Sequence, residues 1–364
     1  MKNRESGYVM QAELFRVGGE PYQIGYELGA LARPVMNAYR LQSAAWRAVS
    51  RWRGHPFVAA LRETAIAYCP EQVEELDGMA AGQGWPVEDV FLWNCRGELV
   101  HRTPDGCTTL AVRSGDRRLI AHNEDGDPWL LDRCWLIDVQ PTGKPGFISF
   151  YYPGSLPGHT FAANRAGLVQ TINNLHLLQP IVGVPRMVLA RALLDASSLD
   201  DAVHLLNTLP RASGFHHTLG WAGDARVLSI EATTERCSTV AIDGVSGHAN
   251  HMIHAGCERS PQIVTASSGD RQTRLDQLLA ASTASAASDP HGRALLNLLR
   301  DKAPSGLPIY RDDPQDPDDE NTLATALFDI ADNGVTMQMY RHEHRVFDTF
   351  IPRTASAPAA TRSI

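Results

Sequence analysis

The residue pattern changes at Cys107, and this change constrains the fold more than any other feature of the chain. Before it, apolar side chains recur at helical spacing over 23–36, and 71–81 runs from a proline to a glycine stop. A third short helix is predicted over 87–93. After Cys107 come short runs rich in β-branched and aromatic residues, at 108–113, 118–123, 134–139 and 147–152. Turn signals separate these runs, so a sheet is predicted to begin at the cysteine.

The remainder of the chain alternates helical and strand patterns. Helices are predicted over 187–195 and 199–207, and strands over 219–222, 226–231, 239–242, 322–330 and 335–340. The segments 280–292 and 312–321 are expected to be loops, the second an acidic, solvated one, and 354–364 a flexible tail. Strands, helices and strands again, with short connections, favour an α+β fold of two packed antiparallel sheets covered by helices.

Composition excludes several classes of partner. The 364 residues are 43% hydrophobic and carry a net charge of -8, with no basic stripe that could neutralise phosphates. Nucleic acid and anionic membrane surfaces are therefore not expected as partners. No run of about eighteen apolar residues and no secretory signal pattern is found, so we expect a cytoplasmic protein. The six cysteines form no CxxC pair, which argues against a zinc ribbon.

Gly106-Cys107 suggests a chemistry. A lone cysteine is usually a small buried apolar residue, but Gly106 presents an unhindered carbonyl that the thiol can attack, with hydrolysis of the resulting thioester. Cleavage would leave 1–106 as a helical pro-segment and 107–353 as a catalytic chain, followed by the tail. The freed α-amino group titrates near ~7.7–8.0 and can take the thiol proton. Nucleophile and base would then share one residue.

Around this dipeptide the chain resembles the acyl-coenzyme A:6-aminopenicillanic acid acyltransferase family, the peptidase C45-like cysteine branch of the N-terminal nucleophile hydrolases. The resemblance spans roughly 15–340. It rests on Asp105-Gly106-Cys107-Thr108-Thr109, Asn123 and Asp125, Asn94-Cys95-Arg96-Gly97-Glu98-Leu99, Gly167, and Asn173-Asn174-Leu175. Gly25 and Gly29 also fit the pattern of this family. The resemblance implies a four-layer αββα sandwich of two antiparallel sheets flanked by helices.

The resemblance also implies roles for individual residues. Asp125 would hydrogen-bond near the cysteine amine or thiol, the alternative being a solvated turn residue. Asn250 matches the asparagine that stabilises the oxyanion. Asn173 or Asn174 is a second candidate donor, unless it caps a turn. Arg96 either stabilises the precursor or binds a substrate carboxylate, with an ion pair to Glu98 as the alternative.

These features favour a self-processing amidohydrolase that cleaves a linear amide of a small N-acylated amine or amino acid derivative through a Cys107 thioester. Acyl transfer to a small amine, possibly from coenzyme A, is the first alternative, and a non-enzymatic scaffold the second. The self-cleaved chains are expected to stay associated, and no cofactor is expected. His216, His217, His248 and His251 match no strong metal motif, so no metal is expected either.

One departure from the family bears on the substrate. Residues 124–128, Glu-Asp-Gly-Asp-Pro, stand where the penicillin-forming enzymes have aromatic residues, which argues against a β-lactam. The two extra acids near the site, Glu124 and Asp127, favour a cationic amine as the leaving group. Sequence leaves open the identity of the acyl and amine parts, the choice of water or amine as acceptor, and the oligomeric state.

Overall fold

The strands form two sheets in the computed structural model, which describes residues 11–100, 106–289, 291–303 and 306–354, with only the backbone of 282–288. The eight-stranded sheet has the order β1-β4-β5-β6-β7-β8-β9-β10, and the six-stranded sheet the order β11-β2-β3-β12-β13-β14. Neighbouring strands are antiparallel, apart from β1, which pairs with β4 in parallel.

The strands are β1 (Leu14–Gly19), β2 (Cys107–Ser114), β3 (Arg117–Gly126), β4 (Trp135–Pro141), β5 (Phe147–Tyr151), β6 (Phe161–Asn164), β7 (Leu168–Leu175), β8 (Gly214–Trp221), β9 (Val227–Ala232), β10 (Cys237–Ala241), β11 (Gly244–His248), β12 (Asn321–Ala331), β13 (Gly334–Arg341) and β14 (His344–Pro352). The α-helices are α1 (Pro21–Gln42), α2 (Ala44–Val49), α3 (Pro56–Tyr68), α4 (Pro70–Gln83), α5 (Val87–Asn94), α6 (Arg96–Leu99), α7 (Arg186–Leu193), α8 (Leu199–Thr208), α9 (Ala266–Ser288) and α10 (Arg293–Leu299).

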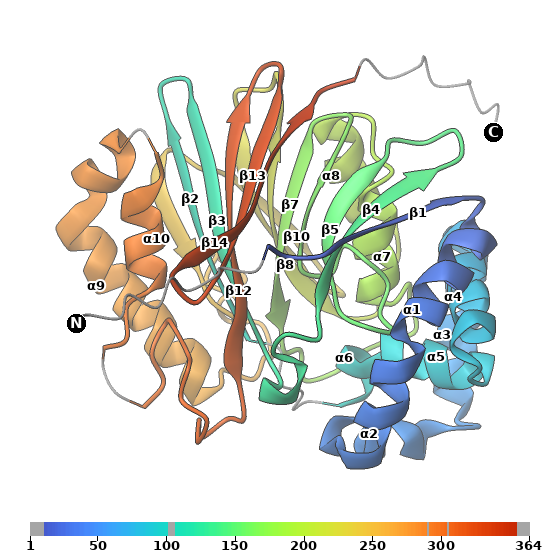
Figure 1. Ribbon diagram of the computed structural model, residues 1–364. Coiled ribbons are helices and arrows are strands. Elements are labelled where there is room, and N and C mark those ends of the chain that lie inside the picture. The colour runs from blue at the N-terminus through green and yellow to red at the C-terminus, as the bar shows by residue number, and fades with distance from the viewer. Residues whose placement is uncertain (1–10, 101–105, 290, 304–305, 355–364) are drawn as a thin grey trace, which may run out of the picture.

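The elements stack in four layers (Figure 1). Helices α9 and α10 cover the outer face of the six-stranded sheet, and the two sheets contact each other through β2, β3, β7, β8 and β9. Helices α7 and α8 pack on the far side of the eight-stranded sheet, and α1 contacts β1 and β4 on the same side. This arrangement confirms the predicted α+β sandwich.

The hairpin of β2 and β3 presents two different faces, because side chains alternate along a strand. Leu110 and Ala121 belong to the apolar cluster under α9 and α10. Ala111 and Ile120 belong to the core between the sheets. The register pairs Cys107 with Glu124, so these two side chains point to the inter-sheet face, like Ala111. The sulfur is thus directed into the space between the sheets.

The N-terminal helices are held close to one another by glycine. Gly25 and Gly29 of α1 lie directly against the backbone of α4, where a Cβ atom would collide with the carbonyl oxygens of Glu75 and Met79. Since only glycine permits this approach, the spacing noted in the sequence has a packing cause.

One of the predicted loops, 280–292, is corrected by the structure. Residues 280–288 continue α9, and the helix ends only before the connection to α10. The alanines of this segment have high helix propensity, which outweighs the serines that suggested a loop. The acidic segment 312–321 is a mostly exposed loop, as expected, although Asp316 and Glu320 turn inward, where buried Arg311 donates to Asp316 and, over 2.7 Å, to Glu320.

Strands β1, β6, β11 and β14 and helices α2, α3 and α10 were not predicted. Of the expected tail, Thr354 donates its backbone N–H to the carbonyl of Arg165, and the rest lies outside the described residues. Within the described part of the chain, no helix combines the length and apolarity needed to cross a membrane.

Candidate active site

Cys107 opens β2 and is 4% exposed. Its side chain lines a pocket together with residues of α1, α5, α7, β3 and β8. Gly106 precedes it in a tight position, because a Cβ atom there would lie 2.6 Å from Glu320 Oε2 and 3.3 Å from Arg271 Nη2. The Gly106 carbonyl accepts a hydrogen bond of 2.9 Å from the backbone N–H of Asp125. Asp105 lies outside the described residues.

Asn250 and Arg271 hold the backbone of Cys107. The Cys107 N–H donates to Asn250 Oδ1 over 2.9 Å, and Arg271 Nη2 donates to the same oxygen over 2.7 Å. Arg271 also donates to the Cys107 carbonyl and, over 2.9 Å, to Thr108 Oγ1. Asn250 Nδ2 donates to the carbonyl of Asn174 over 3.2 Å, which leaves its second hydrogen available at the site. The structure therefore brings Asn250 directly to Cys107.

Sequence reasoning missed Arg271. It stands on α9, far along the chain from Cys107, and it is 1% exposed. An arginine in a helix of polar and small residues resembles a solvated surface residue, and no local motif marks it. Its place against Cys107 follows only from the packing of α9 on β2 and β11.

Asp125 and its neighbour Glu124 lie on opposite faces of β3. Asp125 Oδ1 accepts a hydrogen bond from Thr322 over 2.6 Å, and its Oδ2 has no hydrogen-bond partner in the described part of the chain. Burial raises the pKa of Asp125, although the charges of Arg271 and Arg311 oppose that rise. Glu124, not Asp125, is the acid that the register places beside the sulfur.

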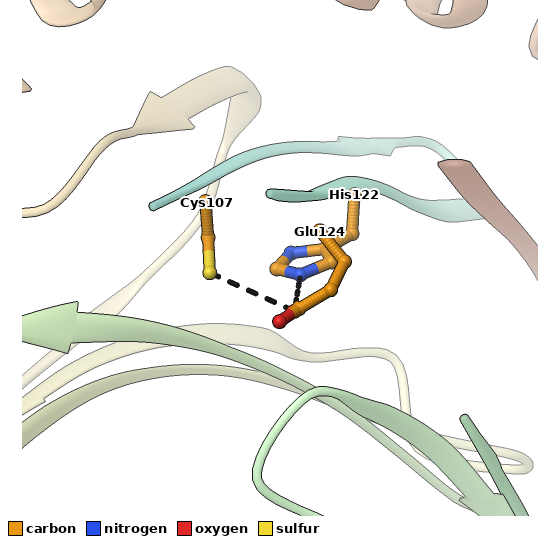
Figure 2. A group of neighbouring side chains, drawn as sticks. All are labelled: Cys107, His122 and Glu124. Atoms are coloured by element: carbon orange, nitrogen blue, oxygen red, sulfur yellow. Dashed lines mark hydrogen bonds and ion pairs between the residues drawn. The ribbon is translucent and has the colours of Figure 1, made fainter. Parts of the chain in front are cut away.

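Figure 2 shows Glu124 between Cys107 and His122. Cys107 Sγ lies 3.6 Å from Glu124 Oε2, and the same oxygen lies 3.1 Å from His122 Nε2. Sequence reasoning considered Glu124 only as an acid that bears on the substrate, and it missed His122. A signal was present, because a turn at 114–116 between the predicted strands sets a register in which Glu124 faces Cys107.

The donor atoms of Cys107, His122 and Glu124 lie within 4.8 Å of one another, close enough for one metal ion. An ion there would bind the sulfur, which would then not be available as the nucleophile that the sequence predicts. The geometry fits proton transfer between the same atoms equally well. A buried thiol, carboxyl and imidazole in one row can pass a proton along the row.

Asn173 and Asn174 occupy different surroundings. Asn173 lies in the inter-sheet space, where its Oδ1 is 2.6 Å from Thr109 Oγ1 and 3.2 Å from His216 Nδ1. Asn174 lines the pocket, and its side-chain oxygen accepts from Arg186. Asn174 is thus the one of the pair that borders the substrate space.

Arg96 also lines the pocket and is 6% exposed. Its guanidinium donates to the Trp93 carbonyl over 3.1 Å and to Ser155 over 3.3 Å, and it lies over the Trp93 ring. The alternative ion pair with Glu98 is not formed, since Glu98 Oε1 accepts instead from the backbone N–H of Arg186. Among the described residues, Arg96 has no carboxylate within ion-pair distance, so its charge is directed to the pocket.

Aromatic and charged residues share the pocket wall. Tyr39, Trp93, Tyr152 and Phe215 supply aromatic surface, and Asp127 accepts a hydrogen bond of 2.8 Å from the Tyr39 hydroxyl. Within the ranges that the structure describes, Asp127 has no cationic partner. A substrate that carries a positive charge can supply one.

Two of the four histidines considered as metal ligands, His216 and His248, stack on each other, and His254 lies edge-on to both. The rings of His216 and His248 are 3.5 Å apart, and Ser229 Oγ lies 2.8 Å from both His216 and His254. His248 Nε2 is 3.1 Å from Glu231 Oε1. These side chains fill the space beneath the site, and none of them lines the pocket of Cys107.

The chain is similar to a known family and to a characterised hydrolase. The pattern of the acyl-coenzyme A:6-aminopenicillanic acid acyl-transferase family matches residues 112–343, more than half of the chain. A β-alanyl-dopamine/carcinine hydrolase of Drosophila melanogaster is 33% identical over 157 residues, which cover 38% of this chain and 41% of the relative. The match thus spans less than half the length of that relative.

Among solved structures, a single-residue variant of a conjugated bile acid hydrolase from Clostridium perfringens superimposes with a TM-score of 0.46 at 12% identity. The superposition covers 68% of this chain and 92% of the other. This likeness is too distant to bear on function.

Proposed function

Because the chain belongs to the acyl-coenzyme A:6-aminopenicillanic acid acyl-transferase family, we propose that it is a self-processing amidohydrolase whose nucleophile is Cys107. The observation that carries the proposal is the position of Cys107 at the head of β2, with its sulfur in a pocket and its backbone N–H on Asn250. A buried structural cysteine needs neither a pocket nor an amide partner.

Turnover would follow cleavage of the bond between Gly106 and Cys107. The freed α-amine takes the thiol proton, and the sulfur attacks the carbonyl carbon of the substrate amide. The second hydrogen of Asn250 Nδ2 supports the oxyanion, as the family resemblance implies. The amine then leaves with a proton, and water hydrolyses the thioester. Asp125 would help to set the charge of the α-amine.

The two chains would remain together after cleavage. Strand β1 from the small chain is part of the eight-stranded sheet, and it pairs over its whole length with β4 from the large chain. Helix α4 of the small chain also contacts α7 of the large one. Separation would expose these buried surfaces, which disfavours dissociation.

The pocket fits a small amide with charged ends. Asp127 and the aromatic side chains beside it suit an ammonium group, and Arg96 suits an anionic or strongly polar group. The Drosophila relative is named for β-alanyl amides, whose acyl part bears an ammonium group. We therefore propose amides of β-alanine or similar ω-amino acids as the first substrates to test.

The test is release of free amine from carcinine by the purified full-length chain, with the neutral N-propanoyl histamine as the matched substrate. Wild type should prefer the charged substrate, and Asp127→Asn should reduce that preference by about tenfold or more, the worth of about 1.4 kcal/mol. Cys107→Ala should release no amine. Turnover that survives Cys107→Ala would contradict the proposal.

Acyl transfer is the second candidate, favoured by the activity for which the family is named. Addition of a second amine distinguishes the two. Hydrolysis yields free β-alanine at an unchanged rate, whereas transfer yields the new amide at the expense of β-alanine. A scaffold would give neither product, and its ligand affinity would be the same with Cys107→Ala.

A further inference from the structure

His122 and Glu124 form a buried row with the sulfur of Cys107 (Figure 2). Cys107 Sγ is 3.6 Å from Glu124 Oε2, which is 3.1 Å from His122 Nε2. All three side chains are buried: Cys107 is 4% exposed, Glu124 3% and His122 0%. Contacts between titratable groups in so dry an environment depend strongly on where each proton lies.

The proton on His122 can be assigned from its neighbours. Asn173 Nδ2 donates to the carbonyl of His248 over 3.1 Å, which fixes Asn173 Oδ1 as the atom 2.6 Å from Thr109 Oγ1. That oxygen only accepts, so Thr109 gives it the hydroxyl proton. His122 Nδ1, 2.8 Å from Thr109 Oγ1, must then be a donor. In the neutral ring the lone pair is therefore on Nε2.

This tautomer requires a proton between Glu124 and His122. Nε2 and Oε2 are 3.1 Å apart, and two bare acceptors would repel each other at that distance. Burial lowers the pKa of His122 to about 3, so the resting ring is neutral. The shared proton then lies toward the carboxyl of Glu124. The pair can take one further proton from the thiol.

The uncut chain needs such an acceptor. Before cleavage the nitrogen of Cys107 is an amide that donates to Asn250, and an amide nitrogen cannot act as a base. The α-amine that serves turnover does not yet exist. Self-cleavage must therefore deprotonate the thiol by another route.

We propose that Glu124, backed by His122, is the proton relay of self-cleavage. The proposal deepens the proposed function and rests on it. Glu124 touches the reacting sulfur and is the catalytic residue, whereas His122 acts through Glu124 and is a positioning residue. The base of self-cleavage, Glu124, and the base of turnover, the freed α-amine of Cys107, are therefore different groups.

Self-cleavage begins with loss of the thiol proton and attack on the Gly106 carbonyl. The thiol proton passes to Glu124 as the shared proton moves to His122 Nε2, and the thiolate forms a C–S bond with the carbonyl carbon of Gly106. The C–N bond breaks, and the relay returns one proton to the nitrogen, which becomes an amine. Water then breaks the C–S bond. One of its protons restores the thiol, and Gly106 leaves as a carboxylate after loss of the other.

The backbone already supports the charge that develops in this step. The Gly106 carbonyl oxygen accepts from the Asp125 N–H over 2.9 Å. A fixed amide donor at the reacting carbonyl stabilises the tetrahedral oxyanion. Attack, proton transfer and oxyanion support thus come from nearby residues of one hairpin.

The experiment follows cleavage of the freshly made full-length chain by intact-mass spectrometry over time. Glu124→Gln, which keeps the shape but cannot cycle a proton, should slow cleavage by about 100-fold or more. Glu124→Asp should recover part of the rate, and the exposed Glu63→Gln should cleave like wild type. Thermal unfolding of each variant verifies that it is folded, and chelation by EDTA should leave the wild-type rate unchanged.

His122→Gln supplies a second readout, the pH profile of cleavage. Tyr152 and Cys134 also face Glu124, and burial raises the pKa of both, so they stay neutral. Without an imidazole to take its proton, Glu124 can accept the thiol proton only after it has lost its own, and burial of the carboxyl disfavours that loss. The acid limb of the profile should therefore move to higher pH. A merely structural role would lower the rate at every pH without moving the limb.

The outcomes separate the two proposals. If wild type cleaves and a folded Glu124→Gln variant cleaves as fast, the relay is wrong while the proposed function stands. Loss of wild-type cleavage in EDTA would replace the relay with a metal. If wild type is never cut, both proposals fall.

Discussion

The two faces of the β2–β3 hairpin carry different chemistry. The inter-sheet face bears Cys107, His122 and Glu124, which lie in a row with 3.6 Å between Cys107 Sγ and Glu124 Oε2 and 3.1 Å between that oxygen and His122 Nε2. The opposite face bears Thr108 and Asp125, beside the buried guanidinium groups of Arg271 and Arg311.

The difference separates reaction from support. On one face a proton can pass along the row, because the sulfur, the carboxyl and the imidazole lie within reach of one another. On the other face, permanent arginine charges hold in place the backbone of Cys107 and the side-chain amide that it contacts. Alternation along a strand puts both sets within a few residues of sequence, so adjacent acids such as Glu124 and Asp125 have unlike surroundings.

The largest effect is expected from the supporting face. Arg271→Met removes the donors to the Cys107 carbonyl, Thr108 and Asn250 together. A loss of about 3 kcal/mol around Cys107 corresponds to about 100-fold slower cleavage. Arg274→Met on the same helix, whose partner is the surface residue Asp301, is the control and should cleave normally. Equal rates in both variants would show that the face gives no support.

Gly106→Ala tests the junction between the two faces. The new Cβ atom would meet Glu320 Oε2, which Arg311 holds in place, so the scissile carbonyl must shift. Strain of about 1–3 kcal/mol should slow cleavage by about tenfold or more, as intact-mass time courses would show. Gly269→Ala, whose Cβ meets only Val264 at 3.8 Å, should have no effect.

Thr109→Val tests the inter-sheet face alone. Valine keeps the shape but leaves His122 Nδ1 and Asn173 Oδ1 without the hydroxyl between them. The cost of about 1–2 kcal/mol should appear as about tenfold slower cleavage. Thr109→Ser, which retains the hydroxyl, should restore the rate. If serine cleaves no faster than valine, the tautomer assigned to His122 is wrong.

The smallest effect concerns acid stability. Burial, reinforced by His248, holds the pKa of His216 well below 6.5, so below that pH the unfolded chain binds a proton that the native chain does not. The free energy of unfolding should therefore fall as pH drops from about 6.5, by up to about 1.4 kcal/mol per pH unit for each such histidine. His216→Gln should flatten this slope in urea titrations. An unchanged slope would mean that His216 is charged in the native state.

Much of the fold could be predicted because its signals are local. The hairpin that begins at Cys107, the helices flanked by proline and glycine, and the strand–helix–strand order all follow from period and turn chemistry. Strand β1 could not be found this way, since it is a short edge strand whose hydrogen-bonded neighbour, β4, lies far along the chain. The helical end of α9 was hidden by its serines.

The site was predictable only in part for the same reason. Cys107 was identified from the Gly106-Cys107 pair at the start of the predicted sheet and Asn250 from the family resemblance, and the structure brings them into contact. Glu124 was not predicted beside the sulfur, because the resemblance assigns the acid near the nucleophile to Asp125, although the hairpin register alone pairs Glu124 with Cys107. Arg271 carries no sequence signal, since its role exists only once α9 packs on β2.

The central claim is that Cys107 frees its own amino group. Intact-mass spectrometry of the denatured wild-type protein and of Cys107→Ala tests it most directly. The account predicts two wild-type chains that separate between Gly106 and Cys107, and a single uncut chain for the variant. A wild-type chain that stays whole while it hydrolyses amides, or a variant that is cut at the same bond, would contradict it.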